Sequence, residues 1–365
     1  MKIMTVLGTR PEIIRLSLII KTLDKCCEHT LVHTGQNYDD NLNKIFFDDM
    51  HIRQPDFYLG VKGKTFGEQI GKIFMESERV INKVRPDKIL VLGDTNSGLV
   101  SIIAKRLGIP VYHLEAGNRC FDDRVPEEVN RKVIDHSSTI LLPYTHNSKE
   151  NLLREGIEIN RIYVVGNPIY EVINTYGKKI IKSNVHKRLK VEPLKYFLVT
   201  IHREENVDDK ARLSNILTAL DMIQKRYKMP VVCSLHPRTE NRMKTHGLHL
   251  DNSEVIFLKP FGFTDFIALE QKALCVITDS GTVQEECCIF RIPNVTVRDV
   301  TERPETLESG SNIITGNNPD KILSCVGIAI SESKDWKIPE EYQVRNVSST
   351  VVKIIAGFNQ IGIHS

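Results

Sequence analysis

Short apolar runs alternate along the chain with longer segments in which apolar residues recur at helical spacing. This alternation is typical of βαβ units and predicts parallel sheets with helical crossovers. In the first half, the strand-like runs lie at residues 2–7, 29–34, 87–92, 110–114, 139–142 and 162–165. In the second half, they lie at residues 196–201, 231–235, 255–258, 274–278 and 294–297. The pattern therefore predicts an α/β protein with two similar halves.

A Gly-Asn-Pro turn at residues 166–168 separates the two series of strands. A length of 365 residues also exceeds what one hydrophobic core usually encloses. We therefore expect an N-terminal domain over residues 1–168 and a C-terminal domain over residues 169–347. Residues 348–358 are apolar at helical spacing. They predict a terminal helix, and residues 348–365 could complete the N-terminal domain.

The composition narrows the class of protein. Of the 365 residues, 41% are hydrophobic and 26% are charged, as in a globular domain, and the net charge of +3 is too small to indicate a nucleic-acid partner. No apolar run approaches the roughly 18–20 residues of a membrane span. The N-terminus is typical of a first strand rather than a signal peptide. The eight cysteines include no Cys-x-x-Cys pair. We expect a cytoplasmic protein with reduced thiols and no membrane partner.

Five polar clusters each follow an apolar, β-rich run. Ligands of open parallel sheets bind beyond the carboxyl ends of the strands, so clusters at these positions converge in space although they lie far apart in sequence. The clusters lie at residues 8–12, 93–97, 113–117, 202–206 and 279–282. This pattern predicts an active site at the strand ends.

Two of these clusters are suited to phosphate. Ser280 and Gly281 are small residues at the start of a predicted helix, where unpaired amides and the helix dipole attract a diphosphate. Glu286 lies one to two turns further on, within reach of an attached ribose. Arg10, in the first strand–helix turn, could bind phosphate oxygens, and Arg15 adds positive charge on the following helix. An ordinary helix cap without a ligand is the alternative for residues 279–282.

Three carboxylates are candidates for proton transfer. Asp94 and Glu115 end neighbouring predicted strands, and Glu127 begins a predicted helix. Carboxylates that share a partly dry cleft are suited to general acid–base catalysis at neutral pH. The alternatives are a helix cap for Asp94 and favourable first-turn charge for Glu127.

His202 and His236 also follow predicted strands, and arginines lie near both. Together they predict a positive rim suited to a nucleotide. A metal site would need more closely spaced ligands than the sequence offers here, so we expect no metal.

The order and spacing of eight blocks carry a family resemblance. The blocks lie at residues 8–12, 33–36, 93–96, 113–117, 126–131, 202–204, 279–286 and 301–305. Over nearly its whole length the chain resembles the non-hydrolysing UDP-N-acetylglucosamine 2-epimerases. The resemblance implies two Rossmann-like domains of the GT-B kind with UDP in the interdomain cleft, a homodimer, and no cofactor.

The resemblance also implies roles for individual residues. Arg10, Ser280 and Gly281 would hold the diphosphate, Glu286 the ribose, and Phe266 would lie near the uracil. The sugar and the bond that breaks would be surrounded by the charged and polar residues Asp94, Glu115, Glu127, Arg131, His202 and Arg303.

The chain departs from the family pattern at two places. Residues 118–122 read Asn-Arg-Cys-Phe-Asp, where typical members continue Leu-Arg. This variant resembles the branch that converts UDP-N-acetyl-L-talosamine to UDP-N-acetyl-L-fucosamine for surface polysaccharide. Cys120 and Phe121 would offer an apolar surface to a 6-deoxy sugar, although Phe121 could instead anchor the loop in the core. Gln36-Asn37 replaces a usual Gln-His pair, so the resemblance does not extend to an activator site there.

The sequence therefore predicts an epimerase that inverts C2 of a UDP-2-acetamido sugar by eliminating and re-adding UDP. Three alternatives remain at this point: a hydrolysing epimerase that releases UDP and free sugar, a GT-B glycosyltransferase, and a non-enzymatic sensor of nucleotide sugars.

Overall fold

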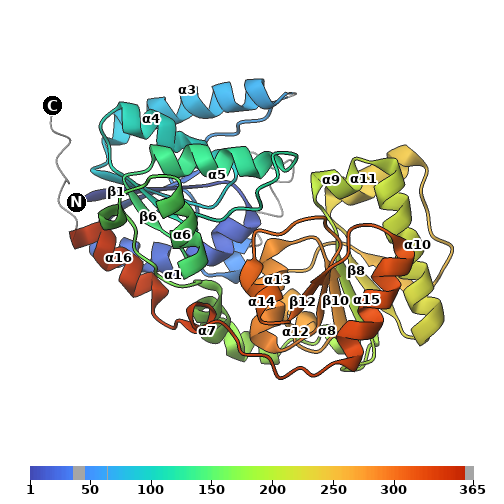
Figure 1. The fold of residues 1–365 in the computed structure, drawn as a ribbon. Coiled ribbons are helices and arrows are strands. Elements are labelled where there is room, and N and C mark those ends of the chain that lie inside the picture. Colours follow the sequence, from blue (N-terminus) through green and yellow to red (C-terminus); the bar gives the residue numbers. More distant parts are fainter. Residues whose placement is uncertain (36–45, 64, 358–365) are drawn as a thin grey trace. The chain divides into compact units, whose positions relative to one another are not determined.

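The computed structural model describes residues 1–35, 46–63 and 65–357 (Figure 1). The chain forms two compact units, one made of Met1–Thr175 with Glu340–Ser365 and the other of Tyr176–Pro339. Each unit contains a six-stranded sheet in which all strands are parallel. The predicted fold class, α/β with two Rossmann-like domains, is confirmed by this architecture.

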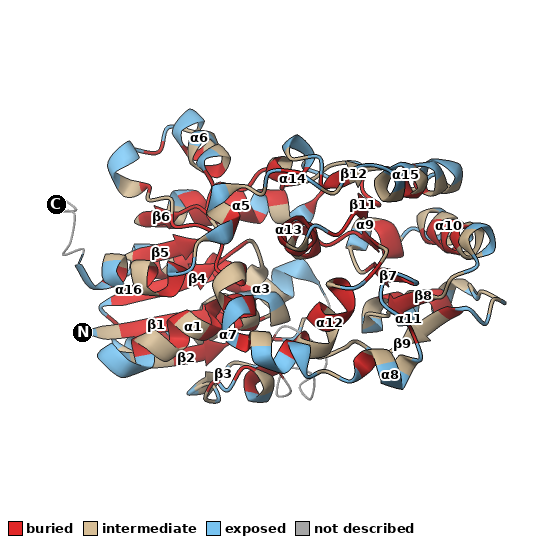
Figure 2. Ribbon diagram, turned by 90° about the horizontal axis from the view of Figure 1, so that it is seen from below, coloured by how far each residue is buried: buried red, intermediate tan, exposed pale blue. Residues whose placement is uncertain are grey.

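The first sheet has the strand order β3-β2-β1-β4-β5-β6. Its central strands are mostly apolar, and every residue of β4 and β5 is buried (Figure 2). The order reverses direction between β1 and β4, which is the topological switch point of a Rossmann sheet. The strands are β1 (Lys2–Leu7), β2 (Glu28–His33), β3 (Phe57–Tyr58), β4 (Lys88–Leu92), β5 (Val111–Leu114) and β6 (Ile140–Leu142).

Helices cover both faces of the first sheet. On one face, three helices and the sheet share one core of buried aliphatic side chains. On the other face lies α1, which packs against α16 (Figure 1). The helices are α1 (Arg10–Cys26), α3 (Phe66–Val84), α4 (Val100–Arg106), α5 (Pro126–Ser137), α6 (His146–Arg154), the first part of α7 (Ile169–Ile181) and α16 (Val347–Gly357), with short 3-10 turns η1 (Asn96–Leu99), η2 (Ile159–Arg161) and η3 (Glu340–Gln343).

The C-terminal helix α16 is held at both ends by charged side chains. At its N-terminus the carboxylate of Glu171 accepts hydrogen bonds from the Ser348 amide at 2.8 Å and the Ser348 hydroxyl at 2.6 Å. Near its C-terminus the buried Lys88 ammonium donates to the carbonyl of Ile355 at 2.5 Å. A negative charge at the N-terminus and a positive charge at the C-terminus both complement the helix dipole. This helix therefore belongs to the first unit although 164 residues of the second unit precede it in sequence.

The second sheet has the order β12-β11-β10-β7-β8-β9 and switches direction between β10 and β7. Its strands are β7 (Phe197–Thr200), β8 (Val231–Ser234), β9 (Val255–Leu258), β10 (Cys275–Thr278), β11 (Asn294–Thr296) and β12 (Asn312–Ile314). One face packs on α10 and α15 through a continuous aliphatic core, and α12 and α13 lie on the other (Figure 1). The helices are α8 (Val185–Leu189), α9 (Glu204–Val207), α10 (Lys210–Tyr227), α11 (Pro237–His246), α12 (Phe263–Glu270), α13 (Gly281–Phe290), α14 (Pro304–Glu308) and α15 (Pro319–Ser331).

The structure differs from the sequence-based expectations in three places. Residues 162–165 were expected to form a strand, but Ile162 makes only an isolated bridge to Leu141, because this segment bonds along one side of β6 and then turns away. The two-residue β3 and the three-residue β12 were not predicted. The first unit extends to Thr175 rather than to residue 168, because α7 continues across the division between the units.

Two further observations concern the described part of the chain. Among those residues, no helix combines the length and apolar character needed to cross a membrane. All eight cysteines are unpaired, and six are buried. Gln36 and Asn37, where the sequence departs from the family pattern, lie outside the described residues.

Candidate functional site

Asp94 lies at the switch point of the first sheet, directly after β4 and Gly93. Its carboxylate oxygen Oδ2 accepts a hydrogen bond from Nε of Arg131 at 2.9 Å and forms an ion pair with Nη2 of the same arginine at 2.7 Å. The Arg131 side chain is buried, whereas 26% of the Asp94 side chain remains exposed. The carboxylate is therefore fixed by a buried cation while one side still faces solvent.

Glu115 follows β5, the strand that pairs with β4, so it lies beside Asp94 at the same edge of the sheet. Its Oε2 forms an ion pair with Nη1 of Arg15 at 2.6 Å, and the Arg15 side chain is only 2% exposed. Its Oε1 accepts from the side-chain amide of Asn118 at 3.1 Å. The structure thus brings Arg15, predicted as a substrate-binding residue, against a predicted proton-transfer carboxylate.

A buried network supports the strand that carries Glu115. The ring of His113 contacts Asp135 through Nδ1 at 2.7 Å and the carbonyl of Gly93 through Nε2 at 2.8 Å. Arg119 contacts the other oxygen of Asp135 at 2.8 Å. Burial alone would raise the pKa of Asp135, but His113 and Arg119 hold it below its usual value. The network joins the ends of β4 and β5 to α5 and so fixes the two carboxylates in register.

Glu12 is a buried carboxyl group at the same switch point. It belongs to the predicted cluster at residues 8–12, but no individual role was predicted for it. Its oxygens accept from the Gly8 amide at 3.1 Å and from the hydroxyls of Thr9 at 2.7 Å and Ser97 at 2.6 Å. Burial raises the pKa of Glu12 to about 7, although these donors partly offset the shift. The residue ties the turn after β1 to the turn after β4. Its position in the first turn of a helix gave no signal beyond ordinary helix capping.

On α5 the structure separates two adjacent glutamates. Glu127, the predicted proton-transfer residue, is half-exposed, whereas Glu128 is buried and contacts Nη1 of Arg131 at 2.7 Å. Glu128 also accepts from the amides of Cys120 and Phe121, both at 3.1 Å. The spacing of Glu128, Arg131 and Asp135 places them on one helical face, which is the signal that could have identified Glu128. The role of Glu127 stays a prediction.

The loop that follows Glu115 presents an aromatic residue to solvent. Phe121 is 73% exposed, so it does not anchor the loop in the core, which was one of the two alternatives from the sequence. Its backbone is in the left-handed region with φ of 55°, an unusual conformation for a bulky residue. The neighbouring Cys120 is buried, and its Sγ lies 3.4 Å from Oε2 of Glu128.

In the second unit, α13 begins directly after the switch-point strand β10. Ser280 is its N-cap, and the Ser280 hydroxyl bonds to Thr282 at 2.9 Å instead of capping the helix. The first amides of a helix have no partner within the helix and can bind an anion. A Cβ atom on Gly281 would lie 2.5 Å from Oε1 of Glu302, so a larger residue at this start of the helix would have to displace the Glu302 carboxylate.

A buried carboxylate also fastens this second switch point. Asp279 accepts hydrogen bonds from the amides of His202 and Arg203 at 3.0 and 2.9 Å, and from the side chain of Asn206 at 3.2 Å. Burial raises the pKa of Asp279, with the amide donors acting in the opposite direction. The His202 ring lies 5.7 Å from that of His236, between centroids. The two predicted histidines are therefore neighbours at the ends of β7 and β8.

Glutamates and arginines surround the start of α13. Arg303 forms an ion pair with Glu285, and the fully buried Arg298 contacts Glu302 at 2.8 Å. Glu286 is buried and hydrogen-bonded to Glu270, whose pKa is raised well above its usual value by burial and by the Glu286 charge. The helix start is therefore lined by guanidinium groups, each balanced by a carboxylate.

Two predicted residues have less defined surroundings. The guanidinium carbon of Arg10 lies 5.7 Å from the centroid of the Phe46 ring in the first unit. Phe266 is half-buried in the first turn of α12 in the second unit. Their roles in binding diphosphate and uracil stay predictions.

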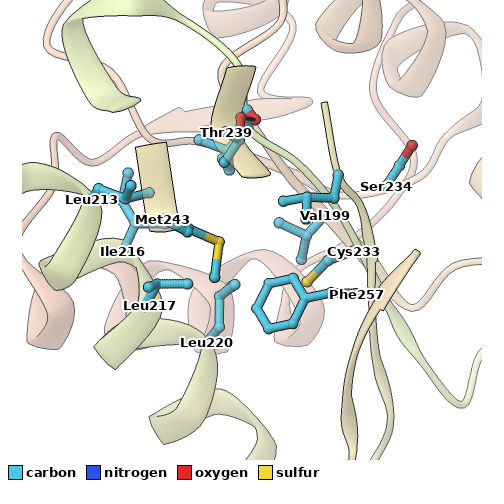
Figure 3. A pocket seen from close by; sticks show the side chains of 12 residues that line it. Val199, Leu213, Ile216, Leu217, Leu220, Cys233, Ser234, Thr239, Met243 and Phe257 are labelled. Atoms are coloured by element: carbon cyan, nitrogen blue, oxygen red, sulfur yellow. Dashed lines mark hydrogen bonds between the residues drawn. The ribbon is translucent and has the colours of Figure 1, made fainter. Parts of the chain in front are cut away.

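A cavity of about 20 Å³ in the second unit does not belong to the site. Most of the side chains that line it are aliphatic and come from α10 and from around β7 and β8, and the lining also includes Met243, Phe257, Cys233, Ser234 and Thr239 (Figure 3). Among residues 1–35, 46–63 and 65–357, no cluster of three or more His, Cys, Asp and Glu side chains has an arrangement that could hold a metal ion.

The chain is similar to known proteins over nearly all of its length. It is 43% identical over 348 residues to a UDP-N-acetylglucosamine 2-epimerase of Methanocaldococcus jannaschii, covering 93% of this chain and 95% of the relative. It is 37% identical over 336 residues to a UDP-2,3-diacetamido-2,3-dideoxy-D-glucuronate 2-epimerase of Pseudomonas aeruginosa, covering 91% and 93%. The crystal structure of the M. jannaschii enzyme in complex with UDP-GlcNAc and UDP matches with a TM-score of 0.94 at 42% identity, covering 98% of this chain and 100% of that one.

The family profile described as UDP-N-acetylglucosamine 2-epimerase matches residues 21–356. This match includes the strand ends that carry Asp94 and Glu115 and the helix start at Gly281. Epimerisation is therefore the activity of the family, and neither glycosyl transfer nor sensing has comparable support. The chain belongs to the UDP-N-acetylglucosamine 2-epimerase family.

Proposed function

We propose that the protein inverts C2 of a UDP-2-acetamido sugar by eliminating UDP and adding it back, without releasing the sugar to water. A carboxylate would remove the proton from C2 while the C1–O bond to UDP breaks, which gives an enzyme-held 2-acetamidoglycal and free UDP. A second acid would then protonate C2 from the opposite face as UDP re-forms the bond to C1. Direct inversion is hard because the C2 proton is only weakly acidic.

The observation that carries this proposal is the pair Asp94 and Glu115. They end adjacent parallel strands, and each is held by a buried arginine. Elimination and re-addition need two proton-transfer groups that act on opposite faces of a sugar ring. Carboxylates fixed by buried cations keep their positions through such a reaction. We leave open which of the two acts on which face.

We propose that the second unit binds UDP. Support comes from the start of α13, where Ser280 and Gly281 begin the helix and the Ser280 side chain does not cap its first amides. The Arg303 guanidinium lies beside Gly281, and His202 lies on the neighbouring turn, next to Asp279. Positive groups and helix amides stabilise the charge that develops as the diphosphate leaves, which is usually the largest single contribution to catalysis. Glu286 would hold the ribose and Phe266 would lie near the uracil.

We further propose that the sugar is a 6-deoxy sugar, so that UDP-N-acetyl-L-talosamine is converted to UDP-N-acetyl-L-fucosamine for surface polysaccharide. Similar proteins carry names for different UDP sugars, so family membership leaves the sugar open. The support is the exposed ring of Phe121, six residues after the Glu115 carboxylate. An apolar surface accepts a methyl group and discriminates weakly against a hydroxyl.

Incubation with candidate UDP-sugars in deuterated water tests the reaction type. Proton NMR should show deuterium entering at C2 together with the epimer, while the UDP-sugar pool stays constant. Accumulation of UDP with free sugar would instead establish the hydrolysing reaction. Absence of deuterium at C2 in every UDP-2-acetamido sugar tested would contradict the proposal.

A substrate comparison tests the sugar. Assays of UDP-N-acetyl-L-talosamine or its fucosamine epimer beside UDP-N-acetylglucosamine should give the higher kcat/KM for the 6-deoxy compounds. A much higher value for the glucosamine compound would overturn the 6-deoxy assignment and leave the epimerase proposal standing.

A further inference from the structure

The first residues of the loop that leaves β5, residues 115–118, pack closely against α6. Glu115 has a φ of 70°, in the left-handed region that is costly for a residue with a side chain. At Gly117, with a φ of 81°, a Cβ atom would lie 2.2 Å from the carbonyl oxygen of Ser148 and 2.8 Å from Leu152. The loop therefore lies directly on α6, and the strained backbone at Glu115 is held there by packing.

Asn118 connects this helix to the Glu115 carboxylate. Its side-chain amide donates to Oε1 of Glu115 at 3.1 Å, and its carbonyl oxygen accepts from the Ser148 hydroxyl at 2.8 Å. The Ser148 hydroxyl in turn accepts from the hydroxyl of Thr145, the N-cap of α6, at 3.2 Å. Asn118 and Ser148 are 7% and 4% exposed. The result is a buried chain of donors that runs from the helix start to the carboxylate.

The two oxygens of Glu115 are thus held from different directions. Arg15 holds Oε2 at 2.6 Å, and Asn118 holds Oε1. A contact to one oxygen leaves the carboxylate plane free to rotate about its terminal bond. A donor on each oxygen fixes that plane, and with it the direction in which a proton can be taken or delivered. The Asn118 amide cannot turn over without losing both the Ser148 and the Glu115 hydrogen bonds.

We propose that Asn118 is a positioning residue that sets the orientation of the Glu115 carboxylate, with Ser148 fixing the Asn118 amide. This inference rests on the proposed function, because it assumes that Glu115 transfers a proton. Asn118 itself acts through Glu115 and takes no proton.

The test measures kcat and KM for N118L, S148A and the double variant, with the UDP-sugar that wild-type protein epimerises in the deuterium assay. Leucine has nearly the shape of asparagine but cannot donate. N151L is the matched control, because Asn151 holds the same loop through the Gly117 carbonyl at 3.0 Å and no hydrogen bond links it to Glu115. Circular dichroism establishes that each variant is folded.

N118L should lower kcat about ten- to a hundred-fold, the scale on which a displaced catalytic group slows a reaction, and change KM by less than about three-fold. S148A should lower kcat less, and the double variant should match N118L because both act through one amide. N151L should stay within about two-fold of wild type.

Three results would overturn the inference: a kcat for N118L within about two-fold of wild type, an equal loss in N151L, or independent losses that multiply in the double variant. If N118L does not fold, an unchanged kcat in S148A overturns it as well. Failure of the proposed function looks different, since E115Q would then retain its turnover.

Discussion

The two units have the same strand order but place opposite chemistry at their switch points. In each, a buried carboxyl group fastens the turns of the two central strands: Glu12 joins those after β1 and β4, and Asp279 joins those after β7 and β10. What the turns display differs. In the first unit, the carboxylates Asp94 and Glu115 each form an ion pair with a buried arginine. In the second unit, the start of α13 lies at the corresponding position. The proposed function therefore assigns proton transfer to one unit and anion binding to the other, on a shared scaffold.

The largest expected effect comes from removing charge in the first unit. Asp94→Asn and Glu115→Gln should each lower turnover by roughly 10²–10⁴, the usual contribution of a general acid or base. UDP affinity, measured by calorimetry, should stay unchanged because UDP is assigned to the second unit. If either amide variant kept near-normal turnover, that carboxylate would have no place in the reaction.

Glu171→Gln is a suitable control for these variants. Glu171 is a carboxylate of the same unit whose hydrogen bonds cap α16 through Ser348. The variant should lose stability without the loss of turnover. A comparable fall in kcat for the folded control would show that the loss reflects the unit as a whole and not its strand-end carboxylates.

The second effect concerns the stability of the first unit, which should depend on pH through Glu12. Burial raises the pKa of Glu12 from 4.5 to about 7, so the folded state binds a proton more tightly than the unfolded state. This contribution to stability is complete below pH 4.5 and is lost as the pH rises through 7. At about 1.4 kcal/mol per pKa unit, the free energy of unfolding should fall by about 3 kcal/mol from this group, and Glu12→Gln should remove that slope.

Denaturant unfolding at several pH values, followed by circular dichroism, measures the Glu12 effect. The single tryptophan, Trp336, lies in the second unit, so its fluorescence supplies an internal reference. The difference between Glu12→Gln and wild type should grow from pH 5 to pH 8 in the first unit. A difference that is independent of pH would mean that Glu12 is ionised throughout.

The smallest expected effect is at the proposed anion site of the second unit. Ser280→Asp should weaken UDP binding about ten-fold, because a negative charge at a helix N-terminus repels the diphosphate by about 1–2 kcal/mol. Ser280→Asn keeps the size and removes the charge, so it should bind UDP nearly as wild type does. Equal affinity of the aspartate and asparagine variants would reduce the start of α13 to an ordinary helix end.

The sequence predicted what depends on local pattern. The sequence predicts Asp94 and Glu115 at the ends of neighbouring strands, because a buried parallel strand shows as an apolar run whichever strands it pairs with. Contacts between residues that are far apart in the sequence could not be predicted. Arg15 and Glu115 are 100 residues apart, and the hydrogen bond from Asn118 depends on where α6 packs.

Neighbouring residues show the same limit. Glu127 and Glu128 are equivalent as first-turn acids, and only the packing of α5 decides that Glu128 is buried against Arg131. Glu12 follows Pro11 at a helix start, where an acid is normally exposed, so its burial could not be foreseen. For Phe121 the sequence left two alternatives, an apolar surface for the sugar or an anchor of the loop in the core. The structure contradicts the second, because the Phe121 side chain is exposed.

Positional isotope exchange tests the central claim, that the C1–O bond to UDP breaks and re-forms while the carboxylates exchange the C2 proton. The substrate would carry ¹⁸O in the oxygen that bridges C1 and the β-phosphate, and phosphorus NMR would follow the label. The account predicts that ¹⁸O moves into the non-bridging positions of the β-phosphate in wild-type protein as C2 inverts, and far more slowly in Glu115→Gln. Inversion at C2 with the label still in the bridge would contradict it.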